Sequence, residues 1–310
     1  MQRAHGIMFH HFHNNRHYRG QGSIDGRTFR NILRHFEKRL LPAQTWYEKA
    51  LAGTLKPDDL CITFDDALLC QYDIAMPILE EVGLTAFWFI NTSVLDGVPE
   101  KLEIYRKFRH LFFDSIDDFY QHFFTVAMQS EWKDTIANGL ENYSHDLFAN
   151  YPFYTPNDTK FRYIRNYLLS QKAYETIMNT MIKEAGADPK NLGCDLWVRE
   201  EHLLDLHRKG HIIGLHSHTH PVDIASLPEQ IQRKEYETNH RRLTQLLGIP
   251  PTTVAHPADS YNETTLRILN ELGIKVGFEA TMHPNTDSSL TFPREDHTTV
   301  QRYIEKTISP

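Results

Sequence analysis

The chain alternates short apolar runs with longer stretches in which apolar residues recur at helical spacing. The runs are rich in β-branched and aromatic side chains, which is typical of strands. They are apolar at nearly every position, which indicates strands buried on both faces, as in a parallel sheet. The expected strands are residues 5–10, 60–64, 85–90, 211–215, 253–255, 276–278 and 290–293.

Helical patterns fill most of the intervals between these runs. The expected helices cover residues 28–40, 72–82, 199–209, 228–247, 263–272 and 298–306. Asp25 is the expected cap of the first helix, and Pro77 is expected to kink the second. Strand–helix–strand units with short links form parallel sheets. The sequence therefore predicts an α/β protein, a distorted (β/α) barrel of about seven parallel strands.

Residues 100–195 have a different character. Aromatic and charged residues alternate there at helical spacing, and no strand pattern is present. We expect a helical insertion within a single domain that spans residues 1–310. The insertion could shape the substrate site, make an oligomer contact, or do neither.

Composition narrows the class of protein. The net charge of −7 and the pI of about 6.2 show no excess of positive charge of the kind that attracts nucleic acid. Three cysteines are an odd number without a pairing pattern, which fits a reducing compartment. No apolar run approaches the roughly 20 residues that span a bilayer, and the first residues lack the apolar segment of a signal peptide. We therefore expect a cytoplasmic protein with no membrane span.

Two adjacent carboxylates, Asp65 and Asp66, end the apolar run at residues 60–64. Parallel sheets place their chemistry beyond the carboxyl ends of the strands. Consecutive strand residues point to opposite faces, so a turn here would let the two carboxylates take different roles. The alternative is an Asx-type turn that only closes the strand.

A histidine cluster, residues 216–220, follows the strand at 211–215. Because His216 and His220 are four residues apart, a helical turn or tight loop can aim both at one point. Two imidazoles with a carboxylate from Asp65 or Asp66 would form a three-ligand metal site, and Ser217 could orient a ring. The alternative is a surface loop in a chain that contains 19 histidines.

The two stretches together resemble the NodB-homology polysaccharide deacetylases of carbohydrate esterase family 4. Thr63-Phe64-Asp65-Asp66 matches the family's first motif, T-F-D-D-G, with Ala67 where glycine is usual. His216-Ser217-x-x-His220 matches the second, H-[ST]-x-x-H. The segment from Pro77 to Phe89 is also similar to the family's sequence after the first motif.

The resemblance implies a role for each residue of these motifs. Asp66, His216 and His220 would bind a divalent metal, and Asp65 would be the general base. A backbone N–H near Ala67 would help to stabilise the oxyanion. Zn²⁺ is the expected ion, and Co²⁺, Ni²⁺ or Fe²⁺ would suit the same ligands.

The later motifs depart from the family pattern. His256 stands where an arginine before a Pro-Tyr pair is usual, and Arg294 is expected to supply the missing cation. We expect His256 and Tyr261 to contact the substrate. His10 is the expected general acid. Its rivals for that role are His11, His13, His256 and His297.

The expected function is hydrolysis of an N-acetyl or N-formyl group on an amino sugar. The expected compartment favours a nucleotide-linked or lipid-linked precursor of a surface polysaccharide. Two alternatives stay open: a carbohydrate O-acetyl esterase, and a non-catalytic carbohydrate-binding descendant.

Overall fold

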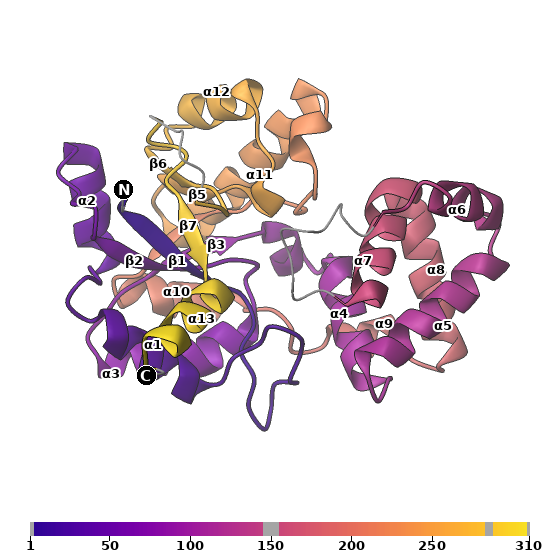
Figure 1. The fold of residues 1–310 in the computed structure, drawn as a ribbon. Coiled ribbons are helices and arrows are strands. Elements are labelled where there is room, and N and C mark those ends of the chain that lie inside the picture. The colour runs from indigo at the N-terminus through magenta and orange to yellow at the C-terminus, as the bar shows by residue number, and fades with distance from the viewer. Residues whose placement is uncertain (1–2, 145–154, 283–287, 309–310) are drawn as a thin grey trace. The chain divides into compact units, whose positions relative to one another are not determined.

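The computed structural model describes residues 3–144, 155–282 and 288–308. The chain divides into two compact units (Figure 1). The barrel unit comprises residues 1–100 and 195–310, and the helical unit comprises residues 101–194. That the helical unit is an insertion within a single functional domain stays a prediction.

The barrel unit is built on a seven-stranded parallel sheet with the order β6-β5-β4-β3-β2-β1-β7. Its strands are β1 (His5–Phe9), β2 (Leu60–Phe64), β3 (Phe87–Ile90), β4 (Ile212–Leu215), β5 (Thr253–Ala255), β6 (Val276–Phe278) and β7 (Arg294–Asp296). All seven carboxyl ends therefore meet at one edge, where the sequence places its candidate chemistry.

The sheet nearly closes because the chain returns to β6 just before β7 begins. Phe292 forms a parallel bridge with Phe278, and its N–H donates to the carbonyl of Gly277 at 2.8 Å. A Cβ atom on Gly277 would lie 2.2 Å from the carbonyl oxygen of Leu290, so only glycine permits this passage. The prediction of a distorted α/β barrel is confirmed.

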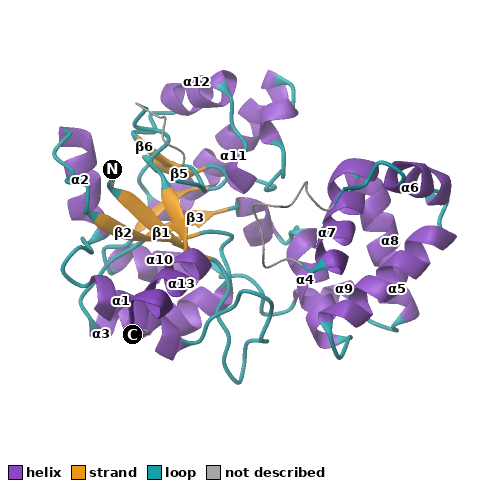
Figure 2. Ribbon diagram, viewed as in Figure 1, coloured by secondary structure: helices purple, strands orange, loops and turns teal. Residues whose placement is uncertain are grey.

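Helices surround the strands of this unit (Figure 2). They are α1 (Gly26–Phe36), α2 (Ala43–Ala52), η1 (Gln71–Ala75), α3 (Met76–Glu81), η2 (Thr92–Asp96), α10 (Glu200–Arg208), η5 (Ile224–Ser226), α11 (Glu229–Leu247), η6 (Pro257–Asp259), α12 (Glu263–Glu271) and α13 (His297–Ile308). The strands separate two apolar layers. Trp46 of α2 packs inside with Phe87, Phe89 and Phe278, whereas Ile62 and Phe64 pack among the helices.

The last strand differs from its prediction. The run at residues 290–293 contributes only the single bridge of Phe292, and β7 consists of Arg294, Glu295 and Asp296. Pro293 has no N–H to donate to a ladder. An apolar pattern could not identify β7, because its inward-facing first residue is a charged arginine.

Two helix boundaries also differ from the sequence pattern. Asp25 caps α1 as predicted, its side chain accepting from the Thr28 N–H at 2.8 Å, but the helix ends at Phe36. Pro77 is the second residue of α3, and a π-turn over Gln71–Ala75 runs directly into this helix, so the helical stretch is irregular just before the proline.

The helical unit contains α4 (Lys101–Leu111), α5 (Ile116–Gln129), α6 (Lys133–Leu140), α7 (Pro156–Tyr163), η4 (Ile164–Leu168), α8 (Gln171–Glu184) and α9 (Pro189–Gly193). Its described residues form no strand (Figure 2). Phe108, Phe119, Phe123, Phe161 and Tyr174 are buried together, so the aromatic pattern marks its core.

Across the described ranges of both units, every helix is too short or too polar to cross a bilayer.

His211, the residue before β4, should make the stability of the fold pH-dependent. Its Nδ1 accepts from the N–H of Ala86 at 3.0 Å and from the indole N–H of Trp88 at 3.2 Å. Burial lowers the pKa of His211 to about 4 from 6.5. The native state therefore binds fewer protons than the unfolded state, and stability falls as pH decreases from about 6.5 towards 4.

The full loss is about 3 kcal/mol of unfolding free energy. Urea unfolding at several pH values measures it, with His211→Asn as the comparison, because asparagine keeps an acceptor that does not titrate in this range. The variant should show the shallower slope of stability against pH. Equal slopes would exclude His211 as the titrating group.

Candidate metal centre and active site

The two carboxylates after β2 separate as the sequence predicts. The Asp65 N–H donates to the carbonyl of Phe9 at 3.3 Å, which continues the ladder between β1 and β2, and its side chain is buried. Asp66 has φ of 74°, in the left-handed region. The chain turns at Asp66, so one carboxylate faces Arg294 and the other faces the histidines.

Arg294 of β7 holds the Asp65 carboxylate inside the barrel. Its Nη1 lies 2.7 Å from Asp65 Oδ1 and 3.3 Å from Thr63 Oγ1, and its Nε donates to the carbonyl of Glu279 at 2.8 Å. Both partners of the ion pair are almost completely buried. Burial opposes ionisation of Asp65, but Arg294 and the nearby histidines outweigh it and lower the pKa of Asp65.

Asp66, His216 and His220 form a group that could hold a metal ion. Asp66 Oδ1 lies 3.4 Å from His216 Nε2 and 3.3 Å from His220 Nε2. Two ligands about 2.0–2.1 Å from one ion in a tetrahedron are separated by about 3.3–3.4 Å. The donor set and its spacing therefore fit a divalent transition metal such as zinc, and neither selects one ion over another.

His216 is oriented for this role by a backbone carbonyl. Its Nδ1 donates to the Ala255 oxygen at 2.9 Å, which leaves the Nε2 lone pair directed at Asp66. Ser217 was the predicted orienting group, but its hydroxyl instead accepts from the His220 N–H at 3.1 Å and closes the loop.

The charges of the cluster make metal binding dependent on pH. Burial disfavours the charged imidazole of His216, but Asp65 and Asp66 raise its pKa above the ordinary value. Burial lowers the pKa of His220, and the histidines hold the pKa of Asp66 well below its usual range despite burial. A proton and a cation therefore compete for the Nε2 of His216, so metal affinity should fall in acid.

His10 lies at the mouth of this site. Its Nε2 is 3.8 Å from Asp65 Oδ2 and 3.8 Å from Asp66 Oδ2, and about a quarter of the side chain is exposed (27%). These distances are too long for hydrogen bonds but leave His10 within reach of a small group between the carboxylates. The structure thus brings together the predicted catalytic and metal-binding residues, which are Asp65, Asp66, His10, His216, His220 and Arg294.

The rival histidines are held by other contacts. His297 is buried, with Nε2 2.9 Å from the Gly22 oxygen, and His13 contacts the Ser23 hydroxyl at 2.8 Å. His11 stacks beside His10. His218, between the two ligand histidines, contacts Thr92 Oγ1 through Nδ1 at 3.0 Å.

The burial of His256, and the hydrogen bonds of both His256 and Tyr261, do not favour the predicted substrate contacts. His256 is 1% exposed, its Nε2 donates to the Leu290 carbonyl at 2.9 Å, and burial lowers its pKa to about 4. Tyr261 stacks on His256 and donates its hydroxyl to Glu279 at 3.0 Å. A direct role in substrate binding stays a prediction for both.

Left-handed backbone is concentrated around this site. Among the non-glycine residues that the structure describes, it occurs at Asp66, Ala67, Ser217, His220, Ala258, Asp259 and Asp195. The first four belong to the two motif loops. Ala67 has φ of 54°, which gives the physical reason that glycine suits this place in the family's motif. Strain of this kind persists where surrounding contacts hold it and is typical of functional sites.

Sequence reasoning missed two buried amides beside the site. Gln71 donates to the carbonyls of His10 and Asp65 at 2.8 and 2.6 Å, so it joins the ends of β1 and β2. Asn91 is 1% exposed, and its side-chain atoms contact no hydrogen-bond partner within the described part of the chain. It follows β3 directly, and Ile90 before it pairs with Leu215, the residue before His216. A polar residue ending an apolar run was the signal for Asn91.

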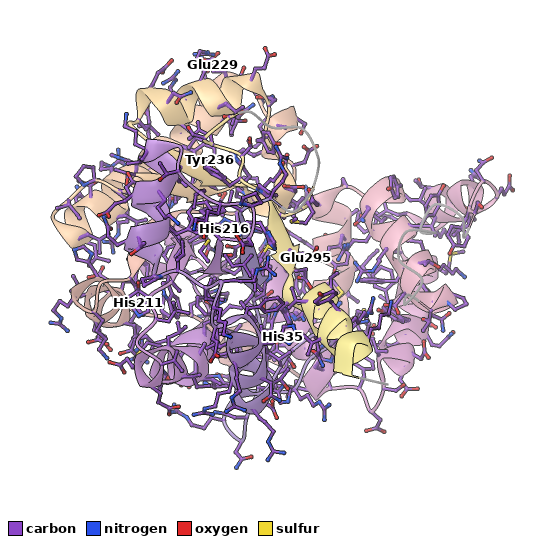
Figure 3. The ribbon with its side chains drawn as sticks, turned by 60° about the vertical axis from the view of Figure 1, so that its left-hand side comes forward. His35, His211, His216, Glu229, Tyr236 and Glu295 are labelled. Carbon is purple, nitrogen blue, oxygen red and sulfur yellow. The ribbon has the colours of Figure 1, made fainter. Side chains whose placement is uncertain are left out.

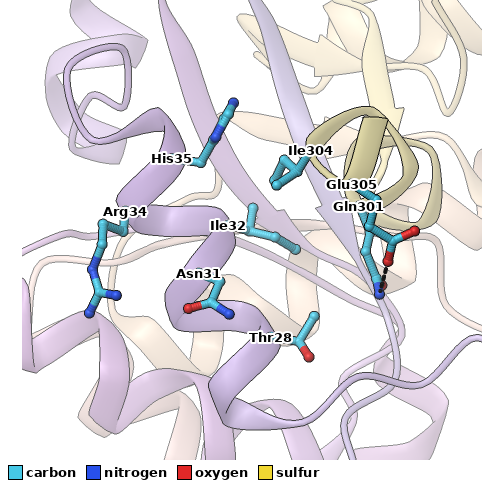
Figure 4. Close-up of a pocket in the computed structure, with 8 residues that line it drawn as sticks. All are labelled: Thr28, Asn31, Ile32, Arg34, His35, Gln301, Ile304 and Glu305. Carbon is cyan, nitrogen blue, oxygen red and sulfur yellow. Dashed lines mark hydrogen bonds between the residues drawn. The ribbon is translucent and has the colours of Figure 1, made fainter. Parts of the chain in front are cut away.

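A pocket of about 630 Å³ lies between α1 and α13 (Figure 4). Ile32 and Ile304 contribute its apolar walls, and His35 and Glu305 lie at its polar margin. It shares no lining residue with the carboxylates and histidines above. His216, by contrast, lies among the side chains gathered within the barrel unit (Figure 3).

The fold and site define an α/β barrel with a candidate Asp–His–His metal centre at the carboxyl edge of its sheet. A family model described as "Polysaccharide deacetylase" matches residues 167–277. This range contains the second motif, whereas Asp65 and Asp66 lie before it. Over this range, and at the two motifs, the chain is similar to the polysaccharide deacetylase family.

Solved structures share the fold at low sequence identity. A Streptococcus pyogenes deacetylase, PplD, in complex with acetate has a TM-score of 0.57 and 14% identity, over 99% of this chain and 98% of that one. IcaB from Ammonifex degensii gives 0.57 and 14%, over 99% and 97%. BC0361, a polysaccharide deacetylase from Bacillus cereus, gives 0.55 and 11%, over 99% and 69%. No curated protein sequence matches the chain.

Proposed function

We propose that the chain is a metal-dependent hydrolase that removes an N-acetyl group from an amino sugar. One observation carries this proposal. Asp65 lies beside the Asp66, His216 and His220 cluster, yet Arg294 binds it on the side away from the ligands. A protein that only bound carbohydrate would have no need of this second, ionised carboxylate.

Asp65 is the proposed general base. Because its pKa lies below the usual value, it is ionised near neutral pH and ready to accept a proton from water. Arg294 fixes the carboxylate through Oδ1, which leaves Oδ2 towards the site. A divalent cation held by Asp66, His216 and His220 would polarise the acyl carbonyl and lower the pKa of the attacking water.

His10 is the proposed general acid. Its Nε2 lies 3.8 Å from Asp65 Oδ2, and its partial exposure allows contact with a bound sugar. The proton that Asp65 takes from water can thus return through His10 to the departing nitrogen. Water adds to the acyl carbon, the C–N bond breaks, and acetate and a free amino sugar leave.

The similarity to polysaccharide deacetylases supports an acetylated carbohydrate as the proposed substrate class. An acetylated amino sugar in a nucleotide-linked or lipid-linked precursor of a surface polysaccharide suits a cytoplasmic enzyme. The cytoplasm is the proposed compartment because the cysteines, Cys61, Cys70 and Cys194, are all free thiols.

Acetate release tests the proposed function. The purified chain would be stripped with a chelator, reloaded with Zn²⁺, Co²⁺, Ni²⁺ or Fe²⁺, and incubated with acetylated nucleotide sugars, chitin oligomers and O-acetylated sugars. Acetate release from an N-acetyl substrate that disappears on stripping and returns on reloading is expected. Release from O-acetyl substrates alone would replace the amidase with an esterase, and release that is insensitive to metal would contradict the mechanism.

A further inference from the structure

The loop from His216 to His220 carries two ligands in a conformation that its own sequence does not favour. Ser217 and His220 have φ of 59° and 57°, in the left-handed region. Residues with a side chain rarely adopt this backbone conformation, because the Cβ atom approaches the following carbonyl oxygen. Only the Ser217 hydroxyl, which accepts from the His220 N–H, holds the loop from within. Contacts from outside the loop must therefore maintain its shape.

Asn239 of α11 joins this loop to the end of β3. Its Oδ1 accepts from the His216 N–H at 3.0 Å. Its Nδ2 donates to the Ile90 carbonyl at 2.8 Å and to Thr92 Oγ1 at 3.1 Å. Asn239 is fully buried, so these hydrogen bonds are shielded from water and fix the backbone from which the first ligand projects.

Glu235, one turn earlier on α11, holds the other half of the loop. One carboxylate oxygen accepts from the N–H groups of His218 at 3.0 Å and Thr219 at 2.7 Å. The second oxygen accepts from the Thr219 hydroxyl at 2.8 Å. Hydrogen bonds to an ionised acceptor are stronger than neutral ones. Glu235 thus fixes the two residues that immediately precede His220.

Residues four apart lie on one face of a helix, so Glu235 and Asn239 act from the same side of α11. We propose that these two side chains are positioning residues that hold the His216–His220 loop in its metal-binding shape. Neither belongs to the metal ligands or to the motifs in the sequence. The inference rests on the proposed function, because it assumes that His216 and His220 bind the ion.

Glu235→Ala is the sharpest test, because Glu235 is only partly buried and its loss should leave the barrel folded. Zn²⁺ affinity would be measured by competition with a chromophoric chelator on the full chain. We expect the dissociation constant to rise about 10- to 100-fold, as is typical when a contact that orients a ligand is lost. Glu237→Ala is the matched control, since Glu237 lies on the exposed face of the same turn and contacts Arg233.

A second readout separates positioning from general stability. Urea unfolding of the metal-free variants would show whether Glu235→Ala weakens the fold itself. Glu235→Gln should recover part of the affinity, because its amide oxygen can still accept from the loop. Asn239→Asp, which keeps the acceptor for His216 but loses both donors, should also weaken Zn²⁺ binding.

The outcomes distinguish this inference from the proposed function. Weaker Zn²⁺ binding in Glu235→Ala, with metal-free stability close to that of Glu237→Ala, supports positioning. If the wild-type chain binds Zn²⁺ and Glu235→Ala binds it with an unchanged dissociation constant, the inference is overturned and the proposed function is not. A wild-type chain that binds none of the four divalent ions overturns the proposed metal site, and the positioning role with it.

Discussion

Replacement of Asp65 by asparagine is expected to reduce kcat for acetate release by about 10²- to 10⁴-fold, the range that a general base contributes. Asparagine keeps an oxygen that can accept from Arg294 Nη1, so the local geometry is preserved. It cannot take a proton from water. The metal content of the loaded variant should equal that of the wild type, because the candidate ligands are Asp66, His216 and His220.

Steady-state acetate release and metal analysis on the same preparations measure both effects. Asp58→Asn is a suitable control, since it makes the same change at an exposed aspartate just before β2. An Asp65→Asn variant that retains full activity would exclude Asp65 as the base. A variant that loses its metal would show that Asp65, rather than Asp66, is the carboxylate ligand.

Replacement of Arg294 by methionine is expected to lower the unfolding free energy by about 3–5 kcal/mol, because it leaves the Asp65 carboxylate buried without its cation. That is a large part of the stability of an ordinary domain. Loss of the guanidinium should also raise the pKa of Asp65. The acid limb of the pH profile of kcat/KM would then move to higher pH, because the base must be ionised to act.

Urea unfolding checks the first effect, and a double variant makes the cause specific. Asp65→Asn combined with Arg294→Met removes both charges and should be more stable than Arg294→Met alone. Arg294→Lys should restore the charge but not the three directed hydrogen bonds, so a partial recovery is expected. If Arg294→Met has the same unfolding free energy as the wild type, the ion pair between Arg294 and Asp65 does not stabilise the barrel as described.

Local patterns were sufficient to predict most of the barrel and the residues of the candidate metal cluster. Uniformly apolar runs identified six strands, and polar residues at two strand ends, Asp65–Asp66 and His216–His220, led to the cluster that the fold assembles. The resemblance to a known family supplied the separate roles for the two aspartates.

The contacts that the sequence could not predict join residues distant along the chain. β7 escaped the apolar pattern because Arg294 faces Asp65 across the barrel interior, 229 positions away in the sequence. Gln71 and Asn239 look like ordinary helix residues until the fold brings backbone carbonyls and N–H groups to them. His256 was assigned to the motif only from its place in the sequence. Its burial depends on the contact with the Leu290 carbonyl, which forms where the barrel nearly closes.

The most direct test of the account is the metal content of the wild-type chain and of Asp66→Ala, after equal loading with Zn²⁺ and removal of free metal. Asp66 Oδ1 lies within 3.4 Å of both histidine Nε2 atoms, so its loss removes the ligand common to the cluster. We predict a single tightly bound ion in the wild-type chain and none in the variant. A wild-type chain that retains no ion, or an Asp66→Ala chain that retains as much, would contradict the account.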